Sequence, residues 1–366
     1  MKNFRKGLIS ALLVACLLVA AYIIYFYLVK NILLTEDTNL ISKSNSVESG
    51  QNNSGRNPLK DKKLFVDSDT EISNLVNDKK LQGKIEEAKL LNMIASQPQA
   101  IWLTGPTAQD TTASRDTSLI TRTSQDASEQ KTIPIYVLYA IPYRDICAGF
   151  SGNSITDNSG YLLWIDKILN NLQSEAIFII EPDAIAHAVM GGCLDEKQTE
   201  DRFTLLNQIS NKLGEHNKVI AAYLDAGHSE WFPNSTVLIE PLKMAGLENV
   251  RGIVINVSFF EPTKELKIWA QQLLSKIGNS KAVIIDTSRN GNGLPPDNVK
   301  GIDRWCNPRG RAIGQNPSTQ TESPLIDAYL WVKRPGESDG TCGGNPPAGV
   351  LSESIAIELA KNSLAN

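Results

Sequence analysis

Four aspartates stand where several carboxylates could act together on one bond. Each follows a short apolar run of the kind that forms a buried strand; they are Asp145, Asp183, Asp225 and Asp339. In α/β barrels the carboxyl ends of the strands meet at one face, and acids there more often serve chemistry than structure. One acid that protonates a leaving oxygen, and a second that handles water or a developing cation, would suit hydrolysis of a glycosidic bond.

The roles of three of these acids can be separated by their neighbours. The apolar run 177–180 and Pro182 hold Asp183 at a strand end, and we interpret Asp183 as the general acid. A proton donor needs a pKa raised by burial or by a nearby negative charge, and Asp145 would supply that charge. A helix N-cap is the alternative for Asp183. We interpret Asp225 as structural or electrostatic support for the site.

The composition is that of a folded, mildly acidic protein. The 366 residues allow one large domain or two small ones, and the hydrophobic share of 42% is enough for a full core. The net charge is −4 and no basic stripe is present, so we expect no nucleic-acid partner. The first 30 residues hold four of the 36 basic residues and no acid, which leaves 32 basic against 40 acidic residues, or −8, in the remainder.

Residues 7–29 form an uncharged stretch of 23 residues behind three basic ones. This length can span a bilayer, and the positive flank predicts a cytoplasmic amino terminus. A retained signal anchor is our first interpretation, because a cleavable signal usually has a shorter apolar region. A cleaved signal peptide and lipidation at Cys16 are the alternatives. All three place residues 35–366 outside the cytoplasm, either secreted or at the outer face of the membrane.

The sequence predicts three parts. Residues 1–34 would be a cytoplasmic stub with the membrane segment, 35–70 a polar flexible linker, and 71–366 the catalytic domain. Helical periodicity over 71–96 opens that domain. The polar segment 110–131 fits a loop or a helix.

After residue 133, short apolar runs alternate with amphipathic segments. The runs rich in β-branched and aromatic residues are predicted strands, at 135–139, 177–180 and 219–224. The amphipathic segments are predicted helices, at 161–172, 200–213, 237–245 and 264–277. This alternation predicts βα units whose parallel sheet closes into a barrel.

Four cysteines besides Cys16 lie in the predicted domain; they are Cys147, Cys193, Cys306 and Cys342. An even number in an exported domain predicts two disulfides. Four cysteines allow three pairings, and spacing alone leaves all three open. No Cys-x-x-Cys pair is present, which disfavours metal binding by these four.

A series of short motifs runs in a fixed order from about residue 85 to 362, among them Glu-Pro-Asp at 181–183 and Leu-Asp-Ala-Gly-His at 224–228. The stretches are 144–145, 180–183, 223–231, 286–293, 305–306, 310–314 and 331–340. With these motifs the chain resembles glycoside hydrolase family 6, the inverting cellulases. The resemblance implies an α/β fold, a distorted seven-stranded parallel β/α barrel with the active-site cleft at the carboxyl ends of the strands. It also implies that no metal or cofactor is needed.

The resemblance assigns the base to Asp339, which would take the proton of water directly or through a chain of waters. Inversion requires the acid and the base to be roughly 6.5–9.5 Å apart. The implied disulfides are Cys147–Cys193 and Cys306–Cys342. Residues implied to bind the sugar chain by stacking or hydrogen bonding are Trp102, Tyr139, Ser151, His228, Trp231, Asn256, Trp305, Lys333 and Glu337.

Loop length bears on where the glucan would be cut. In the family that this chain resembles, exo-acting members cover the cleft with long loops, one of them after the last catalytic aspartate. Here that segment, 339–352, has only 14 residues. We therefore expect an endo-β-1,4-glucanase that cleaves internal bonds of cellulose or a related β-glucan. An exo-acting cellobiohydrolase and a carbohydrate-binding cell-surface protein without turnover are the alternatives. We expect a monomer that contacts the glucan and, through residues 7–29, the membrane.

Overall fold

The computed structural model describes residues 57–107, 110, 112–147, 149–152, 155–278 and 280–364. The predicted membrane segment 7–29 and the predicted linker up to residue 56 lie outside this range. Across the described residues, no helix is both long enough and apolar enough to cross a bilayer.

The compact unit begins at Asn57, earlier than the predicted boundary at residue 71. Leu59 is fully buried, and Phe65 is 3% exposed. The N–H of Phe65 donates to the carbonyl of Ile133 at 2.9 Å, just before a central strand. The predicted linker 35–70 therefore extends too far, because its few large apolar residues after Asn57 are anchored in the fold.

Seven parallel strands form one sheet in sequence order. They are β1 (Ile101–Leu103), β2 (Ile135–Leu138), β3 (Ala176–Ile180), β4 (Val219–Asp225), β5 (Gly252–Ile255), β6 (Ala282–Asp286) and β7 (Ile326–Leu330). Every neighbouring pair is parallel, so all seven carboxyl ends lie at the same edge. This confirms the predicted seven-stranded parallel α/β barrel.

The sheet curls until its first and last strands approach each other. The N–H of Ala100 donates to the carbonyl of Trp331 at 3.0 Å, and the indole N–H of Trp102 donates to the carbonyl of Val332 at 2.8 Å. Between β1 and β7 the described residues form no strand ladder. The barrel is therefore distorted, with side-chain and single backbone contacts at its seam.

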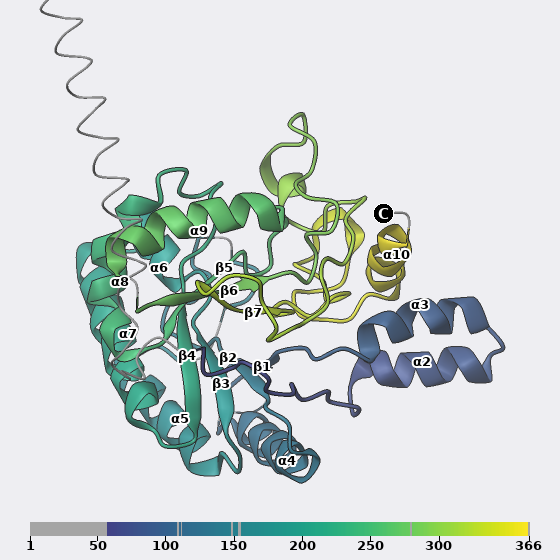
Figure 1. The fold of residues 1–366 in the computed structure, drawn as a ribbon, viewed down its shortest axis with the longest axis horizontal. Helices are drawn as coiled ribbons and strands as arrows, with labels where there is room; N and C mark the ends of the chain where they lie inside the picture. The colour runs from purple at the N-terminus through teal and green to yellow at the C-terminus, as the bar shows by residue number, and fades with distance from the viewer. Residues whose placement is uncertain are drawn as a thin grey trace, which may run out of the picture. The chain divides into compact units, whose positions relative to one another are not determined.

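Helices connect the strands and cover the outer face of the sheet (Figure 1). They are α4 (Ser114–Gln130), α5 (Asn158–Asn171), α6 (Ala184–Met190), α7 (Glu196–Glu215), α8 (Ile239–Met244) and α9 (Thr263–Ile277). Short 3-10 turns lie at Ser235–Leu238, Leu247–Asn249, Gly301–Arg304 and Cys342–Gly344. The polar segment at 110–131 forms α4, in which hydroxyls such as those of Thr121 and Ser124 bond carbonyls four residues back.

The strands are largely apolar on both faces, as a covered parallel sheet requires, with the buried Asp327 of β7 as an exception. All five residues of β3 are buried. Ile177 and Ile179 point into the barrel interior with Val137 of β2. Phe178 and Ile180 belong to the larger cluster under the helices. The continuous apolar runs in the sequence thus reflect burial on both sides of the sheet.

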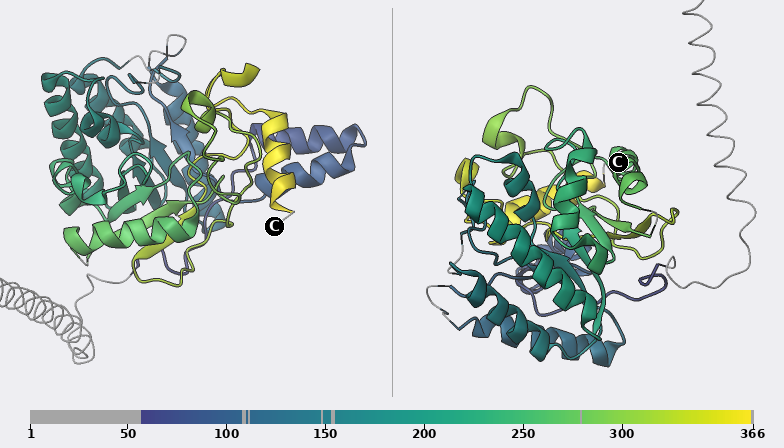
Figure 2. Two further views of the ribbon diagram at one scale, coloured as in Figure 1. Left: turned by 90° about the horizontal axis from the view of Figure 1, so that it is seen from above. Right: turned by 90° about the vertical axis from the view of Figure 1, so that its left-hand side faces the viewer.

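A third apolar cluster joins both ends of the compact unit. The hairpin of α2 (Glu71–Leu81) and α3 (Ile85–Ala95) packs beside α10 (Glu353–Ser363), away from the barrel helices (Figures 1 and 2). Trp331, one residue after β7, is fully buried in this cluster. The loop that follows β7 and carries Asp339 is therefore supported by packed helices.

Candidate active site

Three of the four predicted acids lie at the carboxyl ends of the neighbouring strands β2, β3 and β4, and the fourth lies in the loop after β7. Asp145 lies in the loop after β2, Asp183 follows β3, Asp225 is the last residue of β4, and Asp339 lies in the loop after β7. Asp183 and Asp225 meet directly, since the backbone N–H of Asp183 donates to Oδ1 of Asp225 at 3.1 Å. The sheet thus brings the predicted acids to one edge.

The backbone around these acids is strained. Left-handed φ angles occur at non-glycine residues after β2, β3 and β5; these are Tyr143 (59°), Asp145 (54°), Glu181 (44°), Asp183 (71°), Asn256 (67°) and Ser258 (60°). Each such residue costs on the order of 1 kcal/mol, so it persists only where surrounding contacts hold it. Strain of this kind concentrates at functional sites.

Asp183 has the electrostatics of a proton donor. Burial, followed by the negative charge of Asp145, raises the pKa of Asp183 to about 7. A carboxyl with this pKa keeps a substantial protonated fraction near neutral pH. Asp183 occupies the position before α6, but its side chain makes no capping hydrogen bond there. The N-cap alternative therefore describes its position in the chain and not what its carboxyl does.

Asp145 is held by the loop that follows it. Its Oδ2 accepts the N–H of Ser151 at 2.6 Å and the Ser151 hydroxyl at 3.0 Å. The hydroxyl of Tyr139 lies 3.2 Å from that of Ser151, and the ring of Trp102 meets the Tyr139 ring edge-on at 5.1 Å. Three residues predicted to bind sugar, Trp102, Tyr139 and Ser151, thus cluster around Asp145.

Arg144 organises the same loop without forming an ion pair with Asp145. Its guanidinium donates to the carbonyls of Thr104 at 2.9 Å and Gly152 at 2.8 Å, and also to that of Tyr139. It also stacks over the Tyr139 ring at 4.5 Å. Arg144 therefore fixes the backbone on both sides of Asp145.

Asp225 is a buried support for the Asp183 loop. Its Oδ1 accepts the N–H groups of Asp183 and Gly227, each at 3.1 Å, whereas Oδ2 is buried without a partner. Burial and the neighbouring Asp183 raise the pKa of Asp225 well above its ordinary value. Asp225 therefore favours its neutral form, and this geometry fits the supporting role expected from the sequence.

Asp339 has the opposite environment. Burial alone would raise the pKa of Asp339, but Arg289 at 2.8 Å and Lys333 at 3.6 Å lower it below its ordinary value. The N–H of Asn307 donates to Oδ2 at 2.9 Å, and the N–H of Asp339 donates back to the Asn307 side chain. Asp339 is therefore an ionised carboxylate at neutral pH, as a base must be.

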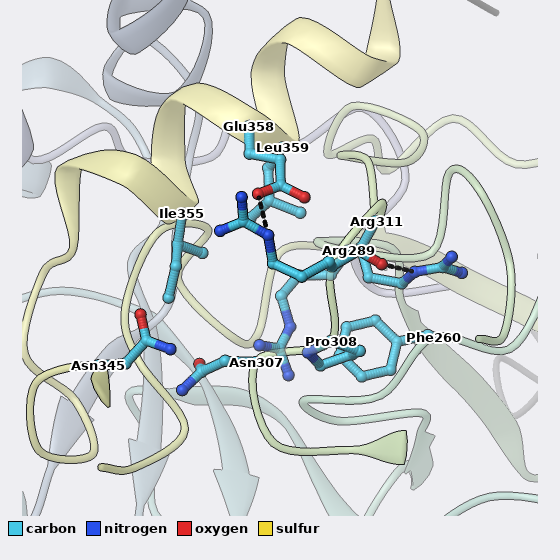
Figure 3. A pocket seen from close by; sticks show the side chains of 10 residues that line it. Phe260, Arg289, Asn307, Pro308, Arg311, Asn345, Ile355, Glu358 and Leu359 are labelled. Carbon is cyan, nitrogen blue, oxygen red and sulfur yellow. Dashed lines mark hydrogen bonds and ion pairs between the residues drawn. The ribbon is translucent and has the colours of Figure 1, made fainter. Parts of the chain in front are cut away.

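A small cavity of about 30 Å³ lies beside the residues that hold Asp339 (Figure 3). Two partners of Asp339, Arg289 and Asn307, are among the residues that line it. On its other side Arg309 pairs with Glu358 at 3.2 Å. Arg289 therefore contributes both to the ion pair with Asp339 and to the wall of this cavity.

Two other predicted sugar contacts form an aromatic stack. His228 is 3% exposed and lies against Phe259 at 3.7 Å and Trp231 at 4.2 Å between ring centroids. Its Nδ1 is 3.5 Å from Glu261, beyond good hydrogen-bond length. Burial lowers the pKa of His228, although Glu261 opposes that shift. His228 is therefore neutral near pH 7 and supports the partly buried Trp231.

Asn256 does not fit the predicted role in sugar binding. It is fully buried. Its amide donates to the carbonyl of Asp286 at 2.8 Å and accepts the N–H of Glu261 at 3.1 Å. Both ends of the side chain thus hold the strained loop after β5. The sequence motif could not distinguish this internal use from an open hydrogen-bonding position.

The remaining predicted contacts lie around the Asp339 loop. Trp305 is partly buried and meets Phe150 edge-on at 5.6 Å. The ammonium of Lys333 lies beside Asp339, and Glu337 pairs with Arg334 at 2.9 Å. Burial raises the pKa of Glu337 despite its basic neighbours. Trp305 and Lys333 thus lie close to the predicted base, while Glu337 is engaged within the loop.

Both disulfides have the implied pairing. Cys147 joins Cys193, which ties the Asp145 loop to the segment after α6. Cys306 joins Cys342, which ties the Trp305 segment to the Asp339 loop. In the described part of the chain, no group of three or more His, Cys, Asp or Glu residues has the arrangement of a metal site.

Three buried residues of the site received no role from the sequence. Glu181 accepts hydrogen bonds from the loop after β2, and Asp286 accepts N–H groups from the loops after β5 and β7. Arg289 holds Asp339. Asp286 shows the same pattern as the predicted acids, an apolar strand that ends in aspartate, so this signal could have found it. No local pattern marks Arg289, since its partner is 50 residues away.

The comparisons with known proteins agree with this geometry. A family model described as Glycosyl hydrolases family 6 matches residues 59–363. Endoglucanase A of Cellulomonas fimi is 38% identical over 274 residues, which cover 75% of this chain and 56% of that protein. Endoglucanase 1 of Streptomyces sp. (strain KSM-9) is 34% identical over 268 residues, 73% of this chain and 70% of that protein. The chain thus spans little more than half the length of the Cellulomonas relative.

One fungal relative carries a different name. It is the "Probable 1,4-beta-D-glucan cellobiohydrolase C" of Aspergillus fumigatus, 32% identical over 248 residues, covering 58% of this chain and 54% of that protein. Among solved structures, the endoglucanase Cel6 from Mycobacterium tuberculosis, in complex with methyl-cellobiosyl-4-deoxy-4-thio-β-D-cellobioside, has a TM-score of 0.74 and 35% identity. That likeness covers 84% of this chain and 99% of the other. The family model matches most of the chain, and the fold is the same barrel as in the Mycobacterium enzyme. The chain therefore belongs to glycosyl hydrolase family 6.

Proposed function

We propose that this protein hydrolyses internal β-1,4-glucosidic bonds of cellulose or a related β-glucan with inversion, with Asp183 as the general acid. The observation that carries the proposal is the raised pKa of Asp183, about 7, beside the carboxylate of Asp145. A proton donor to a glycosidic oxygen must hold its proton at the working pH and release it in the transition state.

The other acids complete the proposed reaction. Asp183 gives its proton to the leaving oxygen while positive charge develops on the sugar ring. Asp145, held on Ser151, would stabilise that charge and keep the pKa of Asp183 high. Asp339, ionised beside Arg289 and Lys333, would take the proton of the attacking water, directly or through further waters. Asp225 would support the Asp183 loop without exchanging a proton with substrate.

The names of the relatives support a β-glucan substrate. The bacterial relatives are endoglucanases, and the Mycobacterium enzyme was solved with a thio-linked cello-oligosaccharide. The Trp102–Tyr139 pair beside Asp145, and Trp305 beside the Asp339 loop, offer aromatic faces on which pyranose rings can stack.

The loop after Asp339 favours internal cleavage. It returns to the fold quickly: the N–H of Gly349 donates to the carbonyl of Ser338 at 2.9 Å, and Glu337 pairs with Leu351 in an isolated bridge. A segment fastened at its base and by Cys342 has little length with which to roof a bound chain. Release from chain ends is the second candidate, because the Aspergillus relative is named a cellobiohydrolase.

The test compares viscosity with reducing ends on carboxymethylcellulose, using the full-length chain and Asp183→Asn as the control. A fast loss of viscosity with few new ends, absent from the control, is expected. Many new ends at nearly constant viscosity would favour release from chain ends. Binding of cellotetraose without any cleavage would replace the proposal with a binding function. Inversion is read from the first product by proton NMR, which should show the α-anomer before mutarotation.

A further inference from the structure

Two buried side chains of opposite charge enclose the backbone that carries Asp145. Oε1 of Glu181 accepts the N–H of Ala140 at 2.9 Å, and Oε2 accepts that of Ile141 at 3.1 Å. The guanidinium of Arg202 donates to the carbonyls of Pro142 at 3.0 Å and Tyr143 at 2.9 Å. The segment 140–143 thus presents amides to the carboxyl and carbonyls to the guanidinium.

These two side chains come from the elements on either side of Asp183. Glu181 lies two residues before Asp183, directly after β3, and is 1% exposed. Arg202 lies on α7, is 3% exposed, and also reaches the carbonyl of Ala184, the residue after Asp183, at 3.4 Å. The hydrogen bonds of Glu181 and Arg202 therefore connect the segment before Asp145 to the segments on both sides of Asp183.

The protonation of both residues suits this arrangement. Burial raises the pKa of Glu181, whereas the two amides and the Tyr161 hydroxyl, which bonds it at 2.5 Å, favour its carboxylate form. In either form its oxygens accept the two backbone amides. Burial lowers the pKa of Arg202 to about 10, so it remains a cation at neutral pH. Its hydrogen-bond partners are all backbone carbonyls. A buried guanidinium of this kind is stable only while those carbonyls stay in place.

We propose that Arg202 and Glu181 are positioning residues that hold the Asp145 carboxylate against Asp183, an inference that rests on the proposed function of Asp183. Tyr143 and Asp145 have left-handed φ angles of 59° and 54°, so this segment would relax without such a hold. Relaxation would move the carboxylate of Asp145 and change the field at Asp183.

The charge on Asp145 is one of several that act on this part of the site. The titratable groups that face Asp183 are Tyr139 and Asp145, which follow β2, and Asp225 at the end of β4. On α6, His187 interacts with Asp145 and Arg202. Tyr139 and Asp145 flank the segment 140–143, and of these two only Asp145 carries a charge that raises the pKa of Asp183. Loss of Arg202 should therefore act mainly through Asp145.

The experiment uses the full-length chain with Arg202→Met, the conservative Arg202→Lys, and Lys212→Met as a matched control. Lys212 lies on the same helix but pairs with Asp166 at the surface. Turnover and KM on carboxymethylcellulose are measured from pH 4 to 9. Arg202→Met should lower kcat by about 10- to 100-fold with KM changed less than about twofold, and should move the alkaline limb to lower pH. Arg202→Lys should fall between, and Lys212→Met should match the unmodified protein.

A second measurement decides the inference even if the protein has no glucanase activity. Carbon-13 NMR of labelled aspartate carboxyls, assigned with Asp183→Asn, gives the titration of Asp183 directly. In Arg202→Met its pKa should fall from about 7 toward the ordinary aspartate range. An unchanged titration in a folded Arg202→Met would overturn the inference, whatever the kinetics show.

If Arg202→Met does not fold, Glu181→Gln supplies the same test, because it keeps the size of the side chain and removes one acceptor. A folded Glu181→Gln with unchanged Asp183 titration and unchanged kcat would overturn the proposal in that case. An inactive unmodified chain whose Asp183 titration still responds to Arg202 or Glu181 would refute the proposed function and leave the positioning role standing.

Discussion

The backbone N–H of Asp183 donates to Oδ1 of Asp225 at 3.1 Å, so one buried carboxyl supports the loop of another. Burial and Asp145 raise the pKa of Asp183 to about 7, and burial and Asp183 raise the pKa of Asp225 well above its ordinary value. Two acids this close titrate as a pair and not as independent groups. Only Asp183 is partly exposed, which gives the pair one member that can reach a substrate.

This asymmetry predicts different results for two matched substitutions. Asp183→Asn should lower kcat on carboxymethylcellulose by about 10²- to 10⁴-fold, the usual contribution of a general acid. Asp225→Asn keeps an oxygen that can accept from Asp183 and Gly227, so its loss should be about tenfold or less. Both variants should bind cellotetraose in calorimetry. Near-normal turnover in Asp183→Asn would refute the assignment of the acid.

The pH profile should reveal the charge of Asp145. Asp183 must be protonated to act, so kcat should fall as pH rises through about 7. Asp145→Asn removes a negative charge that raises the pKa of Asp183, and therefore should move this alkaline limb to lower pH. The profile is measured with initial rates at saturating substrate. A limb that stays in place would mean that another group controls it.

The sequence predicted those features of the fold and the site that depend on neighbouring residues in the chain. Apolar runs followed by aspartate marked strand ends, because burial on both faces of a parallel sheet leaves a continuous apolar signal. That signal found Asp183 and Asp225 and would have found Asp286. The cysteine pairing, in contrast, came from the resemblance and not from spacing.

Features that depend on distant partners were not predictable from the chain. The lowered pKa of Asp339 comes from Arg289, 50 residues earlier, and from the fold that brings them together. Asn256 carried a suitable amide in a suitable motif, yet the fold uses both of its ends internally. The start of the compact unit was missed because Leu59 and Phe65 are isolated apolar residues without periodicity.

Asp183 should also make stability depend on pH. Its folded-state pKa lies above the value in the unfolded chain, so the folded protein retains a proton that the unfolded chain releases between about pH 4 and 7. Stability should therefore fall as pH rises through this window. Asp183→Asn should be more stable than the unmodified protein at pH 8, by roughly 1–4 kcal/mol, and little different at pH 4. Denaturant unfolding at both pH values measures the difference, and an equal change at the two would contradict the linkage.

The Cys306–Cys342 bridge should matter both for stability and for the Asp339 loop. It closes a segment of 36 residues, which in the chain-entropy model contributes roughly 3–4 kcal/mol. Changing both cysteines to serine should lower the free energy of unfolding by this order. Asp339 lies three residues before Cys342 and Asp145 two residues before Cys147, so each double variant, including that of Cys147 and Cys193, should lower kcat at equal folded fraction. An unchanged kcat in both double variants at equal folded fraction would mean that neither bridge positions an acid.

Removing Arg289 should raise the pKa of the proposed base. Arg289 bonds Asp339 at 2.8 Å and is 2% exposed, and its positive charge helps to hold the Asp339 pKa below the ordinary value. A base must be ionised, so kcat should fall as pH drops through its pKa. In Arg289→Met this acidic limb should move to higher pH, while the alkaline limb set by Asp183 stays in place. Arg309→Gln is the matched control, because Arg309 lies on the same cavity but pairs with Glu358 instead. If both limbs moved together, or if Arg309→Gln gave the same shift, the assignment of Asp339 as the base would be wrong.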